Sequence, residues 1–274
     1  MGDGSHTGIE AVAATEQTEA SLPPPVSIAL DERLRDYWFD RVRQSMFDSY
    51  AGVPIGKFPE DLRVYEHLLW ASRANVVVEI GAQFGGSALW FRDRLATMAR
   101  YGRITAGKVF SIDLNIEQAR DRVVAADPAD ITLIEGDVLD PGLAVRVMEL
   151  IPPGSRCFVI EDSAHTFETT TAALRAFASL VPLRGYFVVE DGCVDIEEMR
   201  LTEAWPRGVL PAIRNWLSTT EGSEFTERRD LERYGVSCHP HGFLQRVRPR
   251  GDASATKRSN WRARLNRLRG ASAA

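Results

Sequence analysis

The residues with the most evident chemical potential in this sequence are three acids and a histidine that follow two apolar runs. Asp162 and His165 come just after the run CFVI, and Glu190 and Asp191 come just after the run YFVV. Carboxylates that lie close together repel one another unless a cation joins them. Oxygen donors without cysteine favour Mg²⁺, Mn²⁺ or Ca²⁺ over zinc. We therefore predict that Asp162, Glu190 and Asp191 bind a divalent cation, with Mg²⁺ preferred.

A glycine-rich turn, EIGAQFGGS, begins at Glu79 inside an earlier apolar run and precedes a helical pattern. Glycines in such a turn let the backbone approach a ligand and present free N–H groups to it. The dinucleotide fingerprint G-x-G-x-x-G is absent. The spacing E-x-G-x-x-x-G is instead typical of enzymes that use S-adenosylmethionine (SAM). We predict that Glu79, Gly81, Gly85 and Ser87 belong to a SAM site.

Two further acids stand where a nucleoside would meet the carboxyl ends of parallel strands. Asp113 follows the next apolar run and is a suitable acceptor for ribose hydroxyls. Asp137 follows the run after that and could accept a hydrogen bond from the adenine amine. An acid after a strand is often only a helix cap or part of a solvated turn. The series of acids after successive strands favours a nucleoside site.

His165 is the predicted general base. A hydroxyl made more acidic by a cation would give its proton to the imidazole, and the oxygen would attack the methyl group of SAM. Two structural alternatives remain open: His165 could cap a helix that begins near Thr166, and Asp191 could start a turn with the following glycine. An iron site with two histidines would need His239 or His241, which we do not assign to the site.

Five short apolar runs, all but the last followed by helical sequence, divide the middle of the chain. Such runs are typical of strands buried on both faces of a parallel sheet. The sequence beyond them predicts a helix over 207–219, a polar strand near 224–229 and a strand over 242–247. We therefore predict an α/β sandwich with a mostly parallel sheet and a C-terminal antiparallel hairpin. The five runs are 76–80, 109–112, 131–134, 157–160 and 186–189.

The remaining segments lie before and after the predicted sheet. Residues 1–30 carry acids and no basic residue, which predicts a disordered acidic arm. Residues 31–75 show two helical patterns, the first extending to Tyr50, separated by a Gly- and Pro-rich loop at 52–59 that could cover a site. Residues 76–247 form the predicted catalytic domain, and residues 248–274 form a basic tail.

The composition is that of an ordinary globular chain, with 274 residues, 44% apolar residues and a net charge of −5. No apolar run is long enough to cross a membrane, and no basic and apolar leader opens the chain, so we expect a cytoplasmic protein. The body is acidic, and we expect no nucleic-acid or membrane partner. Cys157, Cys193 and Cys238 lack C-x-x-C spacing and are expected to be free thiols, with Cys157 in a strand core.

Several of these segments together resemble the cephalosporin hydroxylase / rhamnosyl O-methyltransferase family. The resemblance covers about residues 50–247, and the Asp-x-x-His plus Glu-Asp pattern is its most specific part. The segments that carry it are 52–61 (GVPIGKFPED), 79–90 (EIGAQFGGSALW), 110–113 (FSID), 161–165 (EDSAH), 185–192 (GYFVVEDG), 208–213 (GVLPAI), 233–235 (RYG) and 242–247 (GFLQRV).

The resemblance implies a Rossmann-like class I methyltransferase fold, SAM as methyl donor, Mg²⁺ at Asp162, Glu190 and Asp191, and His165 as the base. It also implies a glycosylated small-molecule substrate, with methylation of a rhamnose-like deoxysugar in natural-product or antibiotic biosynthesis, and assembly as a homo-oligomer. Three alternatives are methylation of a phenol or catechol, a SAM-fold partner protein without turnover, and a nucleic-acid methyltransferase that uses the basic tail.

Overall fold

A seven-stranded sheet forms the centre of the computed structural model, which describes residues 34–233 and 237–251. The strand order is β5-β4-β3-β6-β7-β9-β8, with β3 to β7 parallel and β9 antiparallel to both of its neighbours. The predicted mostly parallel sheet with a C-terminal antiparallel hairpin is confirmed. The strands are β3 (Val76–Ile80), β4 (Lys108–Asp113), β5 (Ile131–Glu135), β6 (Cys157–Glu161), β7 (Tyr186–Val189), β8 (Phe225–Glu227) and β9 (Phe243–Arg246).

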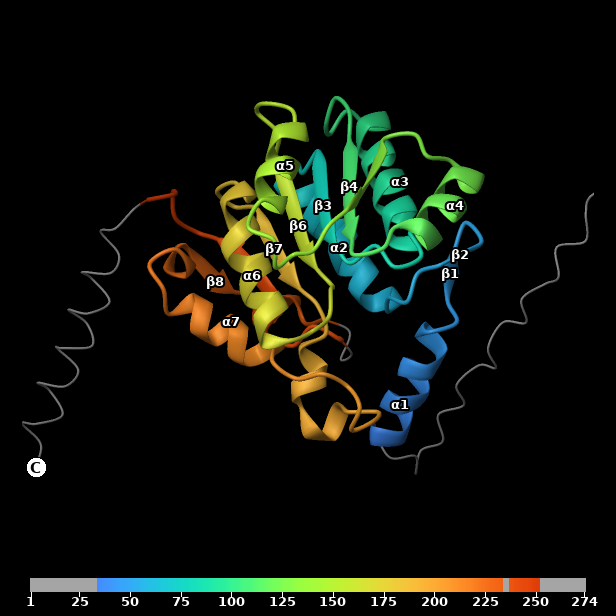
Figure 1. The fold of residues 1–274 in the computed structure, drawn as a ribbon, viewed down its shortest axis with the longest axis vertical. Coiled ribbons are helices and arrows are strands. Elements are labelled where there is room, and N and C mark those ends of the chain that lie inside the picture. Colours follow the sequence, from blue (N-terminus) through green and yellow to red (C-terminus); the bar gives the residue numbers. More distant parts are fainter. Residues whose placement is uncertain (1–33, 234–236, 252–274) are drawn as a thin grey trace, which may run out of the picture.

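Helices cover both faces of this sheet, as Figure 1 shows. One face packs against α2 and α3, and the other packs against α5, α6 and α7. The expected helix over 207–219 is α7. Short 3₁₀ turns follow β7, and the first of them starts at Gly192, so Asp191 does begin a turn with the following glycine, as the alternative above allowed. The helices are α1 (Leu34–Ser45), α2 (Pro59–Ser72), α3 (Gly86–Arg100), α4 (Glu117–Ala126), α5 (Leu143–Leu150), α6 (Phe167–Phe177) and α7 (Val209–Leu217), and the turns after β7 are η2 (Gly192–Asp195) and η3 (Glu197–Met199).

The alternation of side chains along β3 explains how one sheet supports two cores. Val77 packs with α2 and α3, whereas Val76 and Val78 pack with the helices of the opposite face. All three valines are buried, because successive side chains on a strand point to opposite faces and helices cover both. The carboxyl ends of β3, β4, β6 and β7 thus meet at one edge of a rigid sheet.

The prediction of a first helix reaching Tyr50 is wrong. The helix α1 ends at Ser45, and Met46 is 64% exposed. Tyr50 lies in β1 (Ser49–Tyr50), which pairs with β2 (Val53–Pro54) around a tight turn. Ala51 and Gly52 both have a left-handed backbone in this turn, which a continuous helix does not allow. The start of the loop predicted at 52–59 is therefore half of a small hairpin.

Three of the predicted features lie outside the described residues: the acidic arm, most of the basic tail, and the Tyr-Gly pair at 234–235. The segment boundaries proposed above remain predictions. Within residues 34–233 and 237–251, the helices are all too short or too polar to span a lipid bilayer.

Candidate active site

A glycine turn links β3 to α3 at the edge where the strands end. Gly81 has a left-handed φ of +106°, and a Cβ on it would lie 1.9 Å from the carbonyl oxygen of Asp162. The Asp162 N–H donates to the Ile80 carbonyl at 2.8 Å, so the end of β6 lies directly against this turn. Glycine is therefore required at position 81 for the predicted SAM turn and the predicted acid site to lie in contact.

A cavity of about 430 Å³ opens beside this turn at the carboxyl edge of the sheet. Ile55 and Gly56, from the loop between β2 and α2, form part of its wall. Ligands in open α/β sheets bind at this edge. Of the predicted site residues, the structure brings six together around the cavity: Gly81, Asp113, Asp137, Asp162, His165 and Asp191.

The other four predicted residues do not line the cavity. Gly85 and Ser87 lie at the start of α3, and Glu190 lies behind the acids that face the cavity. Glu79 is fully buried and accepts a hydrogen bond from the Ser111 hydroxyl at 2.6 Å. Burial raises the pKa of Glu79 to about 7, despite the opposing effect of the nearby Lys57 ammonium.

Asp113 and Asp137 already hold backbone groups in place. Asp113 Oδ2 accepts from the Gln83 N–H at 2.8 Å, which ties the glycine turn to the end of β4. Asp137 Oδ1 accepts from the Leu139 N–H at 2.8 Å in a local turn. Each carboxylate retains further lone pairs for a ligand, because an ionised carboxylate has about four acceptor sites.

The predicted metal ligands Asp162 and Glu190 share a lysine that sequence reasoning missed. Lys57 Nζ donates to Asp162 Oδ2 at 2.8 Å and to both oxygens of Glu190, at 2.8 and 2.7 Å. Burial disfavours the ammonium, but the two carboxylates outweigh burial and hold the pKa of Lys57 well above its ordinary value. Lys57 thus fastens the loop before α2 to the ends of β6 and β7.

A buried tyrosine also contacts this cluster. The Tyr65 hydroxyl donates to Glu190 Oε1 at 2.7 Å. Burial and the neighbouring carboxylate raise the pKa of Tyr65 well above its usual range, so the hydroxyl remains a donor. Glu190 therefore accepts from both Lys57 and Tyr65.

His165 lies in the loop before α6 with a left-handed backbone, at φ +56°. Its Nε2 is 3.5 Å from Asp191 Oδ2 and 3.9 Å from Asp162 Oδ1, and its Nδ1 is buried without a hydrogen-bond partner among the described residues. Burial opposes protonation, but Asp191 and Asp162 outweigh it and raise the pKa of His165. Thr166, not His165, caps α6, in a reciprocal capping box with Thr169.

His239, which we did not assign to the site, lies within the acid cluster. Its Nδ1 accepts from the Asp191 N–H at 3.0 Å, and its Nε2 lies 3.5 Å from Asp61 Oδ2 and 3.9 Å from Glu190 Oε2. The ring stacks on Tyr65 with centroids 5.9 Å apart. Possible ligand atoms within 4.8 Å of one another form two groups here, Asp162 with His165 and Asp191, and Glu190 with Asp191 and His239.

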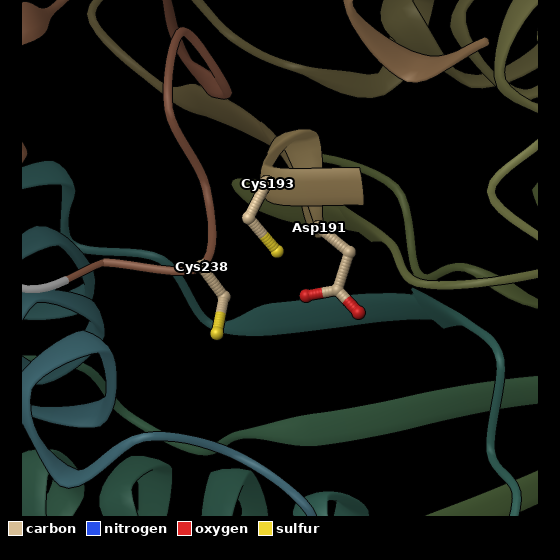
Figure 2. Close-up of side chains that lie close together, drawn as sticks. All are labelled: Asp191, Cys193 and Cys238. Atoms are coloured by element: carbon tan, nitrogen blue, oxygen red, sulfur yellow. The ribbon is translucent and has the colours of Figure 1, made fainter. Parts of the chain in front are cut away.

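Two of the three cysteines lie beside Asp191, as Figure 2 shows. Cys193 and Asp191 project from the turn after β7, and Cys238 faces them from the segment before β9. Cys157 is buried within β6, as expected.

A family model described as rhamnosyl O-methyltransferase/CmcI matches residues 43–247 of this chain. A rhamnosyl O-methyltransferase from Mycobacterium leprae (strain TN) is 31% identical over 200 residues, which are 72% of this chain and 82% of that protein. Another, from Mycobacterium tuberculosis (strain ATCC 25618 / H37Rv), is 26% identical over 200 residues, 72% of this chain and 78% of that protein.

Solved structures share the fold. A CmcI structure with Mg and SAM superposes with a TM-score of 0.54 and 23% identity, covering 83% of this chain and 90% of that one. A CmcI apo-structure gives a TM-score of 0.55 at 24% identity, with coverage of 83% and 90%. The sheet is that of the class I SAM methyltransferases, and the family match covers most of the chain. The chain is therefore a member of the rhamnosyl O-methyltransferase/CmcI family and a SAM-dependent O-methyltransferase.

Proposed function

We propose that this enzyme transfers the methyl group of SAM to a sugar hydroxyl, with His165 as the general base and Mg²⁺ as the metal. The observation that carries the proposal is that one cavity is lined both by Gly81 and Asp113 and by Asp162, His165 and Asp191. Gly81 and Asp113 are suited to bind a nucleoside, and Asp162, His165 and Asp191 are suited to bind a hydroxyl group that must lose a proton.

SAM would lie along the glycine turn. In this assignment Asp113 accepts from the ribose hydroxyls and Asp137 accepts from the adenine amine, while Gly81 allows close approach of the backbone. Glu79, Gly85 and Ser87 do not line the cavity, so their role in this assignment is to support the glycine turn and not to contact SAM. SAM supplies an electrophilic methyl group with its leaving group already attached.

The nature of the donor atoms fits Mg²⁺. Asp162 Oδ1 and both oxygens of Asp191 are not engaged by Lys57, so they remain available to a hard cation. Glu190, the third proposed ligand, already accepts from Lys57 and Tyr65 and does not line the cavity, and the groups of possible ligand atoms within 4.8 Å place it with Asp191 but not with Asp162, so it would bind the cation only after a side-chain movement. When bound, such a cation lowers the pKa of a neighbouring hydroxyl.

His165 is placed to take the proton of the acceptor hydroxyl. With hydrogen on the buried Nδ1, the ring leaves Nε2 free to accept, and Nε2 is the nitrogen that faces Asp162 and Asp191 at the cavity. Asp162 and Asp191 then stabilise the imidazolium that forms. The loop that carries Gly56 and Lys57 lies over the cavity and helps to keep water from the reacting atoms.

The relatives of this chain are the support for a sugar as the acceptor. The Mycobacterium proteins that match over 72% of this chain are rhamnosyl O-methyltransferases, which supports a rhamnose-like deoxysugar on a natural product. Assembly as a homo-oligomer and a role in antibiotic biosynthesis remain predictions. Methylation of a catechol would need the same base and cation, so a catechol is the alternative acceptor with which the sugar must be compared.

The deciding experiment measures transfer of labelled methyl groups from SAM to rhamnosylated and catechol acceptors, with and without a chelator. We expect transfer to the rhamnosylated acceptors, loss of transfer with chelator, and recovery with Mg²⁺. Asp162→Ala and His165→Ala should each retain SAM binding and lose transfer. Preference for catechols would overturn the sugar assignment, transfer unaffected by chelator would overturn the metal assignment, and absence of transfer to every acceptor would contradict the proposal.

A further inference from the structure

Asp191, Cys193 and Cys238 form a further group of possible ligands, which shares Asp191 with the group of Asp162 and His165. The carboxylate oxygen and the two sulfur atoms all lie within 4.8 Å of one another. Figure 2 shows Cys193 and Asp191 on one turn, with Cys238 opposite them on a separate segment. Two thiols and a carboxylate from two segments thus converge on one small volume.

The backbone holds these three residues together. The Cys193 N–H donates to the Cys238 carbonyl at 3.2 Å, and the Asp191 N–H donates to the adjacent His239 ring at 3.0 Å. The Cys238 N–H donates to Asp61 Oδ2 at 3.0 Å, which fixes the second segment against α2. Because both segments are anchored on each side of the thiols, side-chain rotation alone can bring the donors to one ion.

The surroundings favour a cation. Asp61 and Asp191 flank the thiols, and the nearby Lys57 ammonium is already bonded to Asp162 and Glu190. Cys193 is 2% exposed, while the side chain of Asp191 is 33% exposed, so an ion can enter from the side of Asp191. An excess of negative groups at a partly open position attracts a positive ion.

The donor set separates this group from the proposed magnesium site. Thiolates are soft ligands, and two of them with one carboxylate suit Zn²⁺ or Cd²⁺, which take four ligands, whereas Mg²⁺ requires oxygen. A solvent molecule would complete the four.

We propose that Cys193, Cys238 and Asp191 form a binding site for a thiophilic divalent cation such as Zn²⁺. This site goes beyond the proposed methyl transfer. Because Asp191 belongs to both ligand sets, an ion held by the thiols removes an oxygen ligand from the magnesium site. A thiophilic cation bound here therefore inhibits methyl transfer in proportion to its occupancy, and removal of the thiols relieves that inhibition; this consequence rests on the proposed magnesium site.

The test titrates the reduced full chain with CdCl₂ under nitrogen and follows the ultraviolet charge-transfer band of cadmium thiolates. We expect saturation at one Cd²⁺ per chain. Cys193→Ser and Cys238→Ser should each lower the affinity by more than about 100-fold, the upper end of what removal of an outer-shell partner costs. The matched control is Cys157→Ala, which removes the thiol buried in β6 and should leave the titration unchanged.

The readout needs neither SAM nor acceptor, so failure of the methyl-transfer proposal leaves it intact. Absence of the band in the wild type, or its persistence at full strength in either serine variant, would overturn the site. If a serine variant fails to fold, the cadmium NMR resonance of the wild-type complex decides. A position characteristic of two sulfur ligands supports the site, and one characteristic of oxygen ligands refutes it.

Discussion

Lys57 Nζ lies 2.8 Å from Asp162 Oδ2, although 105 positions separate the two residues in the chain. The same ammonium bonds to Glu190, so one lysine compensates acids at the ends of β6 and β7. Lys57 is 4% exposed, so water cannot take the place of the ammonium in stabilising these acids.

Replacement of Lys57 by methionine should lower the free energy of unfolding by about 3–5 kcal/mol, the usual cost of removing one partner from a buried ion pair. The buried Glu190 and the partly exposed Asp162 would then lose the counter-charge that they share. Added Mg²⁺ should restore stability more in the variant than in the wild type, since a bound cation replaces the missing charge. Chemical denaturation with and without Mg²⁺ measures both effects.

The matched control is Lys108→Met, which removes a half-buried lysine at the start of β4, distant from the acids. Its unfolding free energy should change by less than about 1 kcal/mol. A Lys57→Met protein as stable as the wild type would show that the ammonium does not compensate the acids.

Replacement of His165 by alanine should lower kcat by about 10²–10⁴-fold, the usual contribution of a positioned general base. The Kd for SAM should remain within about threefold of the wild-type value, because no cofactor role is assigned to the imidazole. Steady-state kinetics and calorimetric SAM titration separate these quantities. His241→Ala is the control, because His241 pairs with Glu227 on the hairpin, outside the cavity, and should retain activity. Equal kcat values for the two variants would exclude His165 as the base.

Replacement of Asp113 by alanine should weaken SAM binding by about 10–100-fold, because hydrogen bonds to a charged group contribute about 1.5–3 kcal/mol. The variant also frees the Gln83 N–H, which Asp113 holds at 2.8 Å. Asp113→Asn keeps one acceptor oxygen and should lose less affinity. The Kd from calorimetry is the readout, with Asp121→Asn on the exposed side of α4 as the control. An unchanged Kd in Asp113→Ala would rule out the ribose contact.

Glu79 should make the stability of the protein depend on pH. Its pKa rises from the ordinary 4.5 to about 7 on folding, chiefly through burial, although Lys57, Ser111 and Ser87 oppose the rise. The folded state holds a proton that the unfolded state releases, so the contribution is complete below pH 4.5 and is lost as pH rises to 7. Relative to Glu79→Gln, the wild type should lose about 3 kcal/mol over this range.

Urea unfolding at a series of pH values, without SAM, measures this difference. The control is Glu135→Gln, which changes an exposed acid at the end of β5 and should follow the wild-type profile. Parallel profiles for Glu79→Gln and the wild type would mean that folding does not change the pKa of Glu79.

The sheet was predictable because its signals are local. Runs such as 76–80 and 157–160 place apolar side chains on both faces of a strand. This pattern is typical of a strand that helices cover on both sides. The hairpin at β1 and β2 was missed because Tyr50 continues a helical spacing by chance, and only the left-handed turn at Ala51 and Gly52 breaks it.

The position of an acid at the carboxyl edge of the sheet was predictable where the acid ends a strand or directly follows it, as with Asp113 and Asp162. Lys57 stands in a Gly- and Pro-rich loop, where a lone lysine usually indicates a solvated surface, and nothing local shows that Glu190 lies beside it. His239 and Cys238 reach Asp191 only because β9 lies beside β7. Contacts set by strand order have no counterpart in the spacing of residues along the chain.

β9 is translated after every other strand of the sheet, yet it lies inside the sheet, between β7 and β8. The ribosome therefore releases both neighbours before the strand that joins them exists. Cys238 and His239 precede β9 by a few positions, so they reach Asp191 only when this strand inserts. A nascent chain thus carries an unfinished acid cluster until synthesis has passed residue 246.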